Sequence, residues 1–177
     1  MNKKYVWYAS YGSNICLERF LCYIDGEERT ICGKTFSKKP GCTNKRHPTD
    51  SKLYKFKHNV YFANKSSSWN NQGVAFIDLD GKGFAYGRIY KITKGQLCQI
   101  RTQESLYPKW YGHPKNELGK LIDLVDGIEV YTFTQRDSST PRNKPSENYK
   151  KIIIKGLIEI GLSEEDATKY ISKCENQ

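Results

Sequence analysis

The hydrophobic pattern at the start of the chain predicts a strand and then a helix. The apolar run Tyr5–Ala9 has the length and aromatic content of a buried strand, and a polar turn ends it. Beyond the turn, apolar residues recur at the three- and four-residue steps of an amphipathic helix, at Leu17, Phe20, Leu21 and Ile24. We therefore expect a strand, a glycine-containing loop and a helix over about 14–24, which Asp25-Gly26 ends.

The pattern then becomes irregular before strand-like alternation returns. Residues 27–51 mix charged side chains with glycines and prolines, so we expect an irregular insertion with little regular structure. From Leu53 to Ala63 apolar and polar residues alternate, which predicts one half-buried strand. The polar run Asn64–Ser68 is then expected to form a turn.

Four further β-rich runs form two pairs, and each pair is joined by a short segment that contains Asp-Gly. Asp-Gly between strand-like runs is a strong signal for a tight hairpin. We therefore predict two hairpins: one joins Val74–Leu79 to Phe84–Ile92 through Asp80–Gly83, and the other joins Lys120–Val125 to Ile128–Thr134 through Asp126-Gly127.

Capping residues predict three more helices. Thr93 and Gln96 have capping-box spacing, which places a helix from Lys94 to about Glu104. Ser146 and Ser163 are expected to begin the last two helices. This order of elements predicts an α+β domain with a closed or strongly curled sheet, and not an alternating βα repeat.

Composition indicates one domain, residues 1–177, without a bound metal or cofactor. A chain of this length buries about 70% of its unfolded surface, enough for a core without covalent links. The six cysteines include no Cys-x-x-Cys pair, and the three histidines stand apart, so the spacing of a zinc or iron site is missing.

Charge and hydropathy argue against nucleic acid or membrane partners. The net charge is +10, but the basic residues are spread over many segments without a nucleic-acid-binding motif, so we expect a solvated basic surface. No apolar run approaches the roughly 20 residues of a membrane helix. Only about five apolar residues follow Met1–Lys4, too few for a signal peptide, so we expect a cytoplasmic location. Nothing in the pattern indicates an oligomeric state.

Two stretches carry candidate chemistry. Gly12, Ser13 and Asn14 lie where a helix is expected to begin, and backbone N–H groups there lack helical partners and can bind an anion such as a carboxylate. An ordinary turn with a capping residue explains the same residues. Glu104 lies at the end of its predicted helix, where the helix dipole disfavours a negative charge and burial would raise the carboxyl pKa further.

Three separated stretches resemble the signature of the gamma-glutamylcyclotransferase-like family. The first, Tyr11–Asn14, is similar to the family's YGSN loop. The second, the strand Ala85–Ile92 and a helix ending in Gln103-Glu104, is similar to the segment with the family's catalytic glutamate. The third, Pro145–Ile153, is similar to a helix near the family's C-terminus. Ser105 follows Glu104 where the family commonly has Gly.

The resemblance implies a small mixed β-barrel flanked by helices, with a cavity at one end. It further implies that the backbone of Gly12, Ser13 and Asn14 binds the glutamyl part of a substrate. Glu104 would be the catalytic acid and base. The other pocket residues that the resemblance implies are Tyr11, Tyr111 and Tyr149.

The implied activity is a metal-independent cyclotransfer on a small-molecule γ-glutamyl substrate. The α-amine of that substrate attacks its own γ-carbonyl, and 5-oxoproline and an amine or amino acid are released. The alternative is a protein of the same fold that binds a small molecule without converting it, since a fold alone does not prove an activity.

Overall fold

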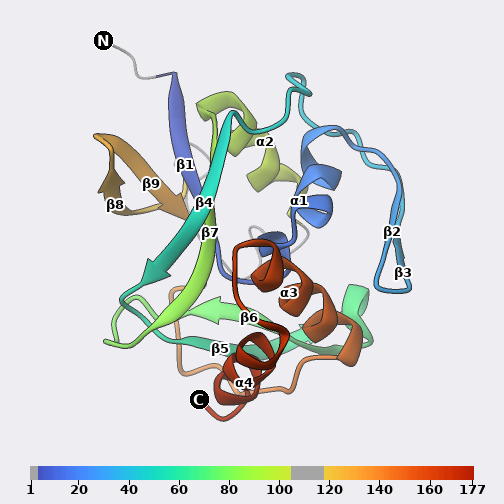
Figure 1. Cartoon of the computed structure of the whole chain (residues 1–177), viewed down its shortest axis with the longest axis vertical. Helices are drawn as coiled ribbons and strands as arrows, with labels where there is room; N and C mark the ends of the chain where they lie inside the picture. The colour runs from blue at the N-terminus through green and yellow to red at the C-terminus, as the bar shows by residue number, and fades with distance from the viewer. Residues whose placement is uncertain (1–3, 105–117) are drawn as a thin grey trace.

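The computed structural model describes residues 4–104 and 118–177, and its centre is a mixed sheet of five strands (Figure 1). The strand order is β4-β7-β1-β9-β8. These strands are β1 (Tyr5–Ser10), β4 (Asp50–Phe56), β7 (Ala85–Thr93), β8 (Lys120–Val125) and β9 (Ile128–Thr132). Among the described residues this sheet is open, with β4 and β8 at its edges, and is not closed into the barrel that the resemblance implied.

β1 lies in the middle of the sheet because its side chains are buried on both faces. Residues 6–10 are all buried, as in a strand that is covered on two sides. β1 pairs antiparallel with β7, where Tyr8 lies opposite Tyr90, and parallel with β9, where Trp7 lies opposite Val130. The loop that follows β1 therefore starts from the centre of the fold.

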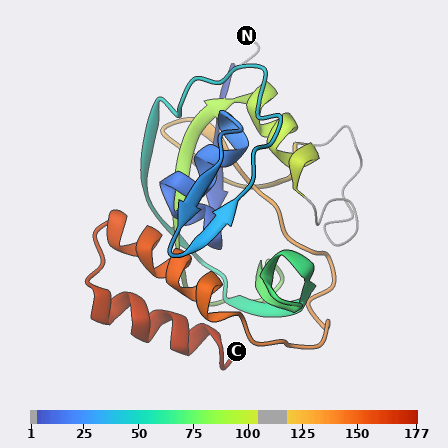
Figure 2. The same cartoon turned by 90° about the vertical axis from the view of Figure 1, so that its right-hand side faces the viewer.

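Two small sheets complete the β structure of the described residues. β5 (Val60–Ser66) pairs with β6 (Gln72–Ile77), and β2 (Arg29–Ile31) pairs with β3 (Lys34–Phe36). In Figure 1 the β5–β6 sheet crosses below the large sheet. Figure 2 shows the β2–β3 hairpin in front of α1 (Leu17–Ile24).

The later helices begin at the predicted capping residues. Thr93 and Gln96 form a complete capping box at the start of α2 (Lys94–Gln103). Ser146 caps α3 (Glu147–Glu159), and Ser163 caps α4 (Glu164–Cys174). In the N-terminal region, a 3-10 turn, η1 (Ser13–Ile15), replaces the first part of the predicted helix, so α1 begins later than expected. A second 3-10 turn, η2 (Ser67–Trp69), follows β5.

The connection through Asp80–Gly83 is not the predicted hairpin. β6 pairs with β5, whereas β7 pairs with β4 and β1, so this connection crosses between two sheets. Asn59 holds both ends of it, because its side-chain oxygen accepts from the Phe84 N–H at 3.2 Å and its carbonyl from the Asp78 N–H at 3.0 Å. The other predicted hairpin, around Asp126-Gly127, is confirmed by the pairing of β8 with β9.

One other expectation about the middle of the chain was wrong. The predicted strand 53–63 is two strands, β4 and β5, in different sheets, and β5 continues through part of the predicted turn at 64–68. Residues 27–51 contain the β2–β3 hairpin, whose turn uses Cys32 and Gly33 at φ values of 50° and 76°. Strands of three residues are too short to show alternation in the sequence.

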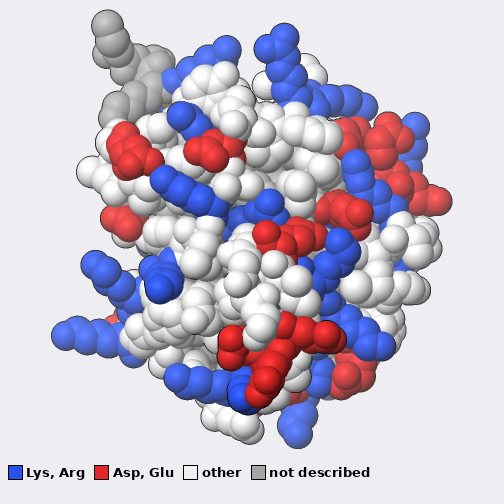
Figure 3. All heavy atoms as spheres, in the orientation of Figure 1, with Lys and Arg blue, Asp and Glu red and all other residues white. Residues whose placement is uncertain are grey.

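The distribution of charge on the surface and the hydrophobicity of the helices both limit the kinds of partner to consider. On the face in Figure 3, basic and acidic side chains are interspersed and do not gather in one patch. No helix in residues 4–104 and 118–177 combines the length and hydrophobicity that crossing a bilayer requires.

Candidate active site

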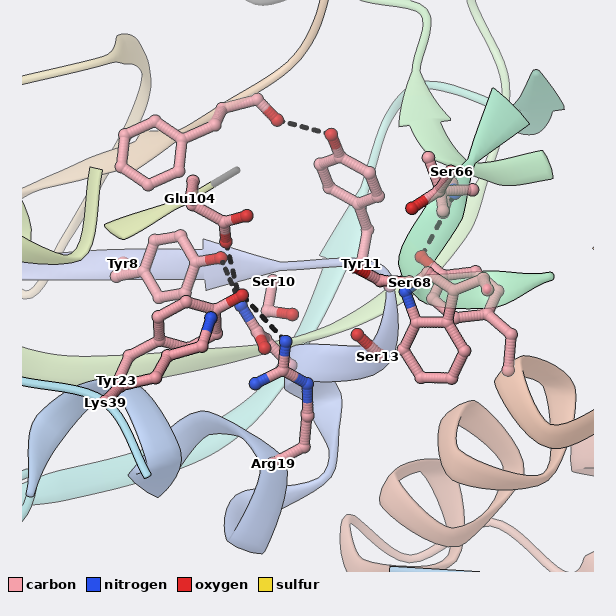
Figure 4. A pocket seen from close by; sticks show the side chains of 17 residues that line it. Tyr8, Ser10, Tyr11, Ser13, Arg19, Tyr23, Lys39, Ser66, Ser68 and Glu104 are labelled. Atoms are coloured by element: carbon pink, nitrogen blue, oxygen red, sulfur yellow. Dashed lines mark hydrogen bonds between the residues drawn. The ribbon is translucent and has the colours of Figure 1, made fainter. Parts of the chain in front are cut away.

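A pocket opens beside the loop that follows β1. A close view shows the side chains of 17 residues that line it (Figure 4). They come from β1 and its loop, α1, the segment after β3, the region from the end of β5 through η2 to β6, the end of α2, the residue after β9 and the start of α3. Its volume is about 90 Å³, several times the roughly 10–15 Å³ that one water needs, so it can hold part of a small molecule.

The structure brings together every predicted site residue that it describes. The pocket lining includes Tyr11, Gly12, Ser13, Asn14, Glu104 and Tyr149. Tyr111 lies outside the described residues. Because residues from three distant parts of the chain meet at one cavity, the site is geometrically possible, whereas the role of each residue stays a prediction.

The loop is fixed from behind by hydrogen bonds to its backbone. The Tyr90 hydroxyl donates to the carbonyls of Asn14 and Ile15, at 2.7 and 3.0 Å. Arg88 also donates to the Ile15 carbonyl, at 3.3 Å. α3 packs so closely here that a Cβ on Gly156 would lie 2.3 Å from the backbone nitrogen of Cys16. The loop therefore has little freedom to move when a ligand binds.

The first N–H of α1 is not available to a ligand. The Leu17 N–H donates to the carboxylate of Glu159 at 2.9 Å, and the same carboxylate oxygen pairs with Arg88 at 2.8 Å. This negative charge at the start of α1 also suits the helix dipole. The Leu17 N–H is therefore not free to bind an anion in the pocket.

Glu104 lies at the end of α2 and reaches the pocket. Its backbone N–H donates to the Ile100 carbonyl at 3.1 Å, which fixes the main chain as the helix ends. Its carboxylate accepts from the Asn14 side-chain amide at 3.3 Å. The same amide nitrogen donates to the Tyr8 hydroxyl at 3.2 Å. Asn14 thereby links the loop to the candidate catalytic carboxylate, a contact between residues that are far apart in sequence.

Burial raises the pKa of the Glu104 carboxyl above its ordinary value, although two cations and two hydrogen bonds oppose this. The cations are Arg19 and Lys39, and the hydrogen bonds come from Asn14 and Tyr23. A carboxyl group with a raised pKa is suited to accept a proton and return it at neutral pH.

Tyr149 closes another side of the pocket. Its hydroxyl accepts from the Ala75 N–H at 3.1 Å, and burial raises its pKa to about 12, so the hydroxyl keeps its proton. A Cβ on Gly12 would lie 2.8 Å from the Tyr149 oxygen, so only glycine fits there without a shift. The Tyr11 hydroxyl, by contrast, donates to the Phe133 carbonyl and supports the loop.

Sequence reasoning missed several residues of the pocket. Arg19 lies within the predicted amphipathic helix, and Lys39 lies within the segment predicted to be irregular. Tyr8 lies in the predicted strand and Tyr23 in the predicted helix. The other lining residues that the sequence did not indicate are Ser10, Ser66, Ser68, Trp69, Val74, Ala75 and Phe133. Only the four-residue spacing of Arg19 and Tyr23, which brings them together on α1, was visible in the sequence.

Metal binding finds no support in the described part of the chain. No group of three or more His, Cys, Asp or Glu residues is arranged to hold a metal ion in residues 4–104 and 118–177. The lining formed by the described residues combines backbone amides, hydroxyls, aromatic rings, one carboxyl group and two cations.

Comparison of the sequence finds one distant relative among the curated proteins. No family model matches the chain. Histone deacetylase 5 of Arabidopsis thaliana is 28% identical to it over an alignment that covers 96% of this chain and 30% of that protein. This chain therefore spans less than a third of the relative's length.

Solved structures share the architecture more fully. A gamma-glutamyl cyclotransferase is 20% identical, with a TM-score of 0.61 over 94% of this chain and 86% of that chain. An uncharacterised protein from Homo sapiens is 21% identical, with a TM-score of 0.60 over 95% and 87% of the two chains. YkqA from Bacillus subtilis is 19% identical, with a TM-score of 0.60 over 97% of this chain and 55% of that one. The chain therefore has the gamma-glutamylcyclotransferase-like fold.

Proposed function

We propose that this protein is an enzyme of the gamma-glutamyl cyclotransferase type. The observation that carries the proposal is the position of Glu104, a carboxyl group with a raised pKa that is hydrogen-bonded to Asn14 of the loop, in one pocket with Gly12 and Ser13. The likeness to a gamma-glutamyl cyclotransferase supports the fold of such an enzyme.

The reaction is an intramolecular acyl transfer. The α-amine nitrogen of a γ-glutamyl compound forms a bond to the γ-carbonyl carbon, and the bond from that carbon to the departing nitrogen breaks. The products are 5-oxoproline and the free amine. Because the nucleophile belongs to the same molecule as the carbonyl, holding the substrate in a folded conformation supplies much of the rate.

Glu104 moves the proton in this proposal. The α-amine is protonated in neutral solution and must lose a proton before it attacks, while the departing nitrogen must gain one. Ionised Glu104 accepts the first proton and then donates it to the departing nitrogen, so the net proton count does not change. General acid and base catalysis of this kind contributes about 10²–10⁴-fold in rate.

The loop holds the glutamyl part of the substrate in the same proposal. The backbone of Gly12, Ser13 and Asn14 borders the pocket, and its N–H groups are suited to a carboxylate.

All six cysteines are free thiols, and four of them are buried, which supports a reducing compartment such as the cytoplasm.

A protein that binds a γ-glutamyl compound without converting it is the alternative. A protein that only binds a γ-glutamyl compound has no use for a buried carboxyl group with a raised pKa, because no proton has to move during binding. The presence of Glu104 in the pocket therefore favours the enzyme.

The test is to incubate the purified protein and the variant Glu104→Gln with γ-glutamyl dipeptides and γ-glutamyl amines. Release of 5-oxoproline, followed by mass spectrometry, is expected from the wild type and not from the variant. Equal release by both proteins would remove Glu104 from the mechanism. No release by a folded wild type, together with measurable binding of the same compounds, would favour the binding protein.

A further inference from the structure

Arg19 is a buried cation in the wall of the pocket. Only 7% of its surface is exposed, and the rings of Tyr23 and Phe36 lie 4.6 and 4.4 Å from its guanidinium carbon. Nη2 donates to the Tyr23 hydroxyl at 2.8 Å, whereas Nε and Nη1 are buried without a hydrogen-bond partner in the described part of the chain. Buried donors of a charged group are costly to leave unpaired, which points to a bound molecule that satisfies them.

Among the described residues, Arg19 also lacks a carboxylate partner within ion-pair distance. Among the ion pairs formed within residues 4–104 and 118–177, none includes Arg19. Burial lowers the pKa of its guanidinium, but the neighbouring Tyr23 and Glu104 outweigh this effect and hold the pKa above its ordinary value. Arg19 therefore stays charged. In Figure 4 its guanidinium extends from α1 toward Tyr23 and the Glu104 side of the pocket.

Lys39 supplies a second cation to the same wall. Its Nζ lies 4.7 Å from the centre of the Tyr23 ring, the ring that also contacts Arg19. Burial, and then the charge of Arg19, lowers the pKa of the Lys39 ammonium group. Two cations that repel each other in a partly buried site are stabilised when an anion lies between them.

The backbone that carries Lys39 is firmly anchored. The Lys39 N–H donates to the Gly26 carbonyl at 2.8 Å, and the Cys42 N–H donates to the Ile24 carbonyl at 2.8 Å. Gly26 has a φ of +78°, and a Cβ there would lie 2.2 Å from the Lys39 carbonyl oxygen. The segment 27–42 is thus tied to the end of α1 at its two ends and holds Lys39 over the pocket.

The β2–β3 hairpin within this segment also contacts Trp69 of η2, which lines another side of the pocket. Phe36 packs against Trp69, with ring centres 5.7 Å apart, and the Lys34 ammonium lies 4.9 Å from the Trp69 ring. Segment 27–42 therefore contributes a wall that joins α1 to η2. Because Arg19 and Lys39 lie side by side at this wall, the wall should favour a bound group with a negative charge.

The charges of the pocket favour an anionic ligand group. When Glu104 is ionised, Arg19 and Lys39 still leave an excess positive charge. The glutamyl part of a γ-glutamyl substrate carries one carboxylate and one ammonium group, so it does not cancel this excess. A carboxylate on the departing amine would cancel it, whereas a polyamine would add further positive charge.

We propose that Arg19 and Lys39 form a subsite for an anionic group on the amine that is released, and that segment 27–42 thereby determines specificity. The proposal rests on the proposed cyclotransferase function and names the part of the substrate that these residues bind. The matching substrates are γ-glutamyl compounds whose departing amine carries a carboxylate.

The test compares three compounds that share the γ-glutamyl group: γ-glutamylalanine, γ-glutamylethylamine and γ-glutamylputrescine, whose departing groups are anionic, neutral and cationic. We expect wild-type kcat/KM to be about 10- to 100-fold higher for γ-glutamylalanine than for γ-glutamylethylamine, the size of a charge-assisted hydrogen bond, and lowest for γ-glutamylputrescine. Lys39→Met should remove most of this preference, because the ratio of kcat/KM for γ-glutamylalanine to kcat/KM for γ-glutamylethylamine should fall toward one. Lys38→Met, at an exposed neighbouring position, makes the same change in charge and should keep the preference.

The variants Arg19→Met and Arg19→Lys show which part of the substrate Arg19 binds. If Arg19 binds the departing group, Arg19→Met lowers kcat/KM for γ-glutamylalanine more than for the ethylamine compound, so the ratio of the two values falls, and Arg19→Lys restores part of that ratio. A change in the pKa of Glu104 would affect both compounds alike. An equal loss on all three compounds would assign Arg19 to the glutamyl carboxylate and overturn the proposal. Should Arg19→Met not fold, Lys39→Met decides the question, because Lys39 is only half-buried.

If the proposed enzyme activity is absent, the subsite can still be tested by measuring ligand binding. If folded wild type releases no 5-oxoproline from any of the three compounds, calorimetry measures their binding instead. Tighter binding of γ-glutamylalanine by the wild type and by Lys38→Met, but not by Lys39→Met, would support the anionic subsite without the activity. Equal binding of all three compounds by the wild type would overturn it.

Discussion

The two walls of the pocket are encoded in different ways. Gly12, Ser13, Asn14 and Glu104 lie in short motifs that are visible in the sequence, whereas the wall with Lys39 belongs to a segment without a recognisable pattern. The first wall holds the groups proposed to react. The second holds Lys39, one of the two cations proposed to select the substrate, and the other, Arg19, extends from α1. Reactive groups and selective groups can therefore be carried by separate parts of one chain.

The two walls also differ in the kind of contact that holds them. The loop is held by hydrogen bonds from Tyr90 and Arg88 to its carbonyls and by the close contact of Gly156. Segment 27–42 is held by a few backbone hydrogen bonds and by contacts between rings and cations. Changes in the first wall should therefore affect turnover, and changes in the second should affect selectivity.

The largest effect is expected for Glu104→Gln in the first wall. Turnover should fall by about 10²–10⁴-fold, because glutamine cannot accept the proton. Wild-type activity should be lost as the pH falls through the raised pKa of Glu104, at a higher pH than the ordinary glutamate pKa of about 4.3. A pH–rate profile measures this, and an acidic limb that persists in Glu104→Gln would assign the titration to another group.

The same variant tests the raised pKa through stability. Because the folded protein binds the Glu104 proton more tightly than the unfolded chain, ionisation of Glu104 lowers the free energy of unfolding as the pH rises above the ordinary glutamate pKa. Glu104→Gln should thus melt at or above the wild-type temperature at pH 7, and the difference should shrink toward pH 4. A clearly lower melting temperature at pH 7 would contradict the raised pKa.

Gly156→Ala should disturb the first wall from behind. A Cβ there would lie 2.3 Å from the Cys16 nitrogen and 2.5 Å from the Ile15 carbonyl carbon, so α3 or the loop must shift. We expect a loss of about 1–3 kcal/mol in the free energy of unfolding, together with reduced turnover. Gly95→Ala in α2 is the control, because its Cβ would meet only Thr93 Oγ1 at 3.9 Å. Denaturant unfolding of both variants measures this, and equal stabilities would show that the contact of α3 with the loop is not tight.

Gly26→Ala should disturb the second wall. Gly26 and Gly33 have nearly equal φ values, +78° and +76°, so an alanine at either position loses about 1–2 kcal/mol from backbone strain. Only at Gly26 would the Cβ strike the Lys39 carbonyl, since nothing lies within 4 Å at Gly33. Gly26→Ala should therefore reduce the preference for an anionic departing group, whereas Gly33→Ala should keep it. The same change of preference in both variants would mean that the backbone contact does not position Lys39.

The smallest effect is expected for Tyr149→Phe. The variant removes the hydroxyl that accepts from the Ala75 N–H, and the free energy of unfolding should fall by about 0.5–1.5 kcal/mol. Because burial raises the pKa of Tyr149 to about 12, the pH–rate profile below pH 10 should keep its shape. A lost alkaline limb in that range would instead give the Tyr149 hydroxyl a role in proton transfer.

The sequence by itself predicted the elements whose signals are local. The capping residues Thr93, Ser146 and Ser163 mark helix starts that the structure confirms, because a cap acts within one turn of its own helix. The hairpin at Asp126-Gly127 is confirmed for the same reason. The motifs at Tyr11–Asn14 and Glu104 indicated residues that the fold does bring to one pocket.

Only the tertiary structure decided how these elements pair and what surrounds the site. The connection at Asp80–Gly83 carries a hairpin signal, yet β6 and β7 take partners in different sheets, because strand pairing depends on distant residues. In the same way, Arg19 and Lys39 meet at the Tyr23 ring only after segment 27–42 is tied to Gly26. The charge of the pocket is a property of side chains that folding brings together, and no local pattern in the sequence records it.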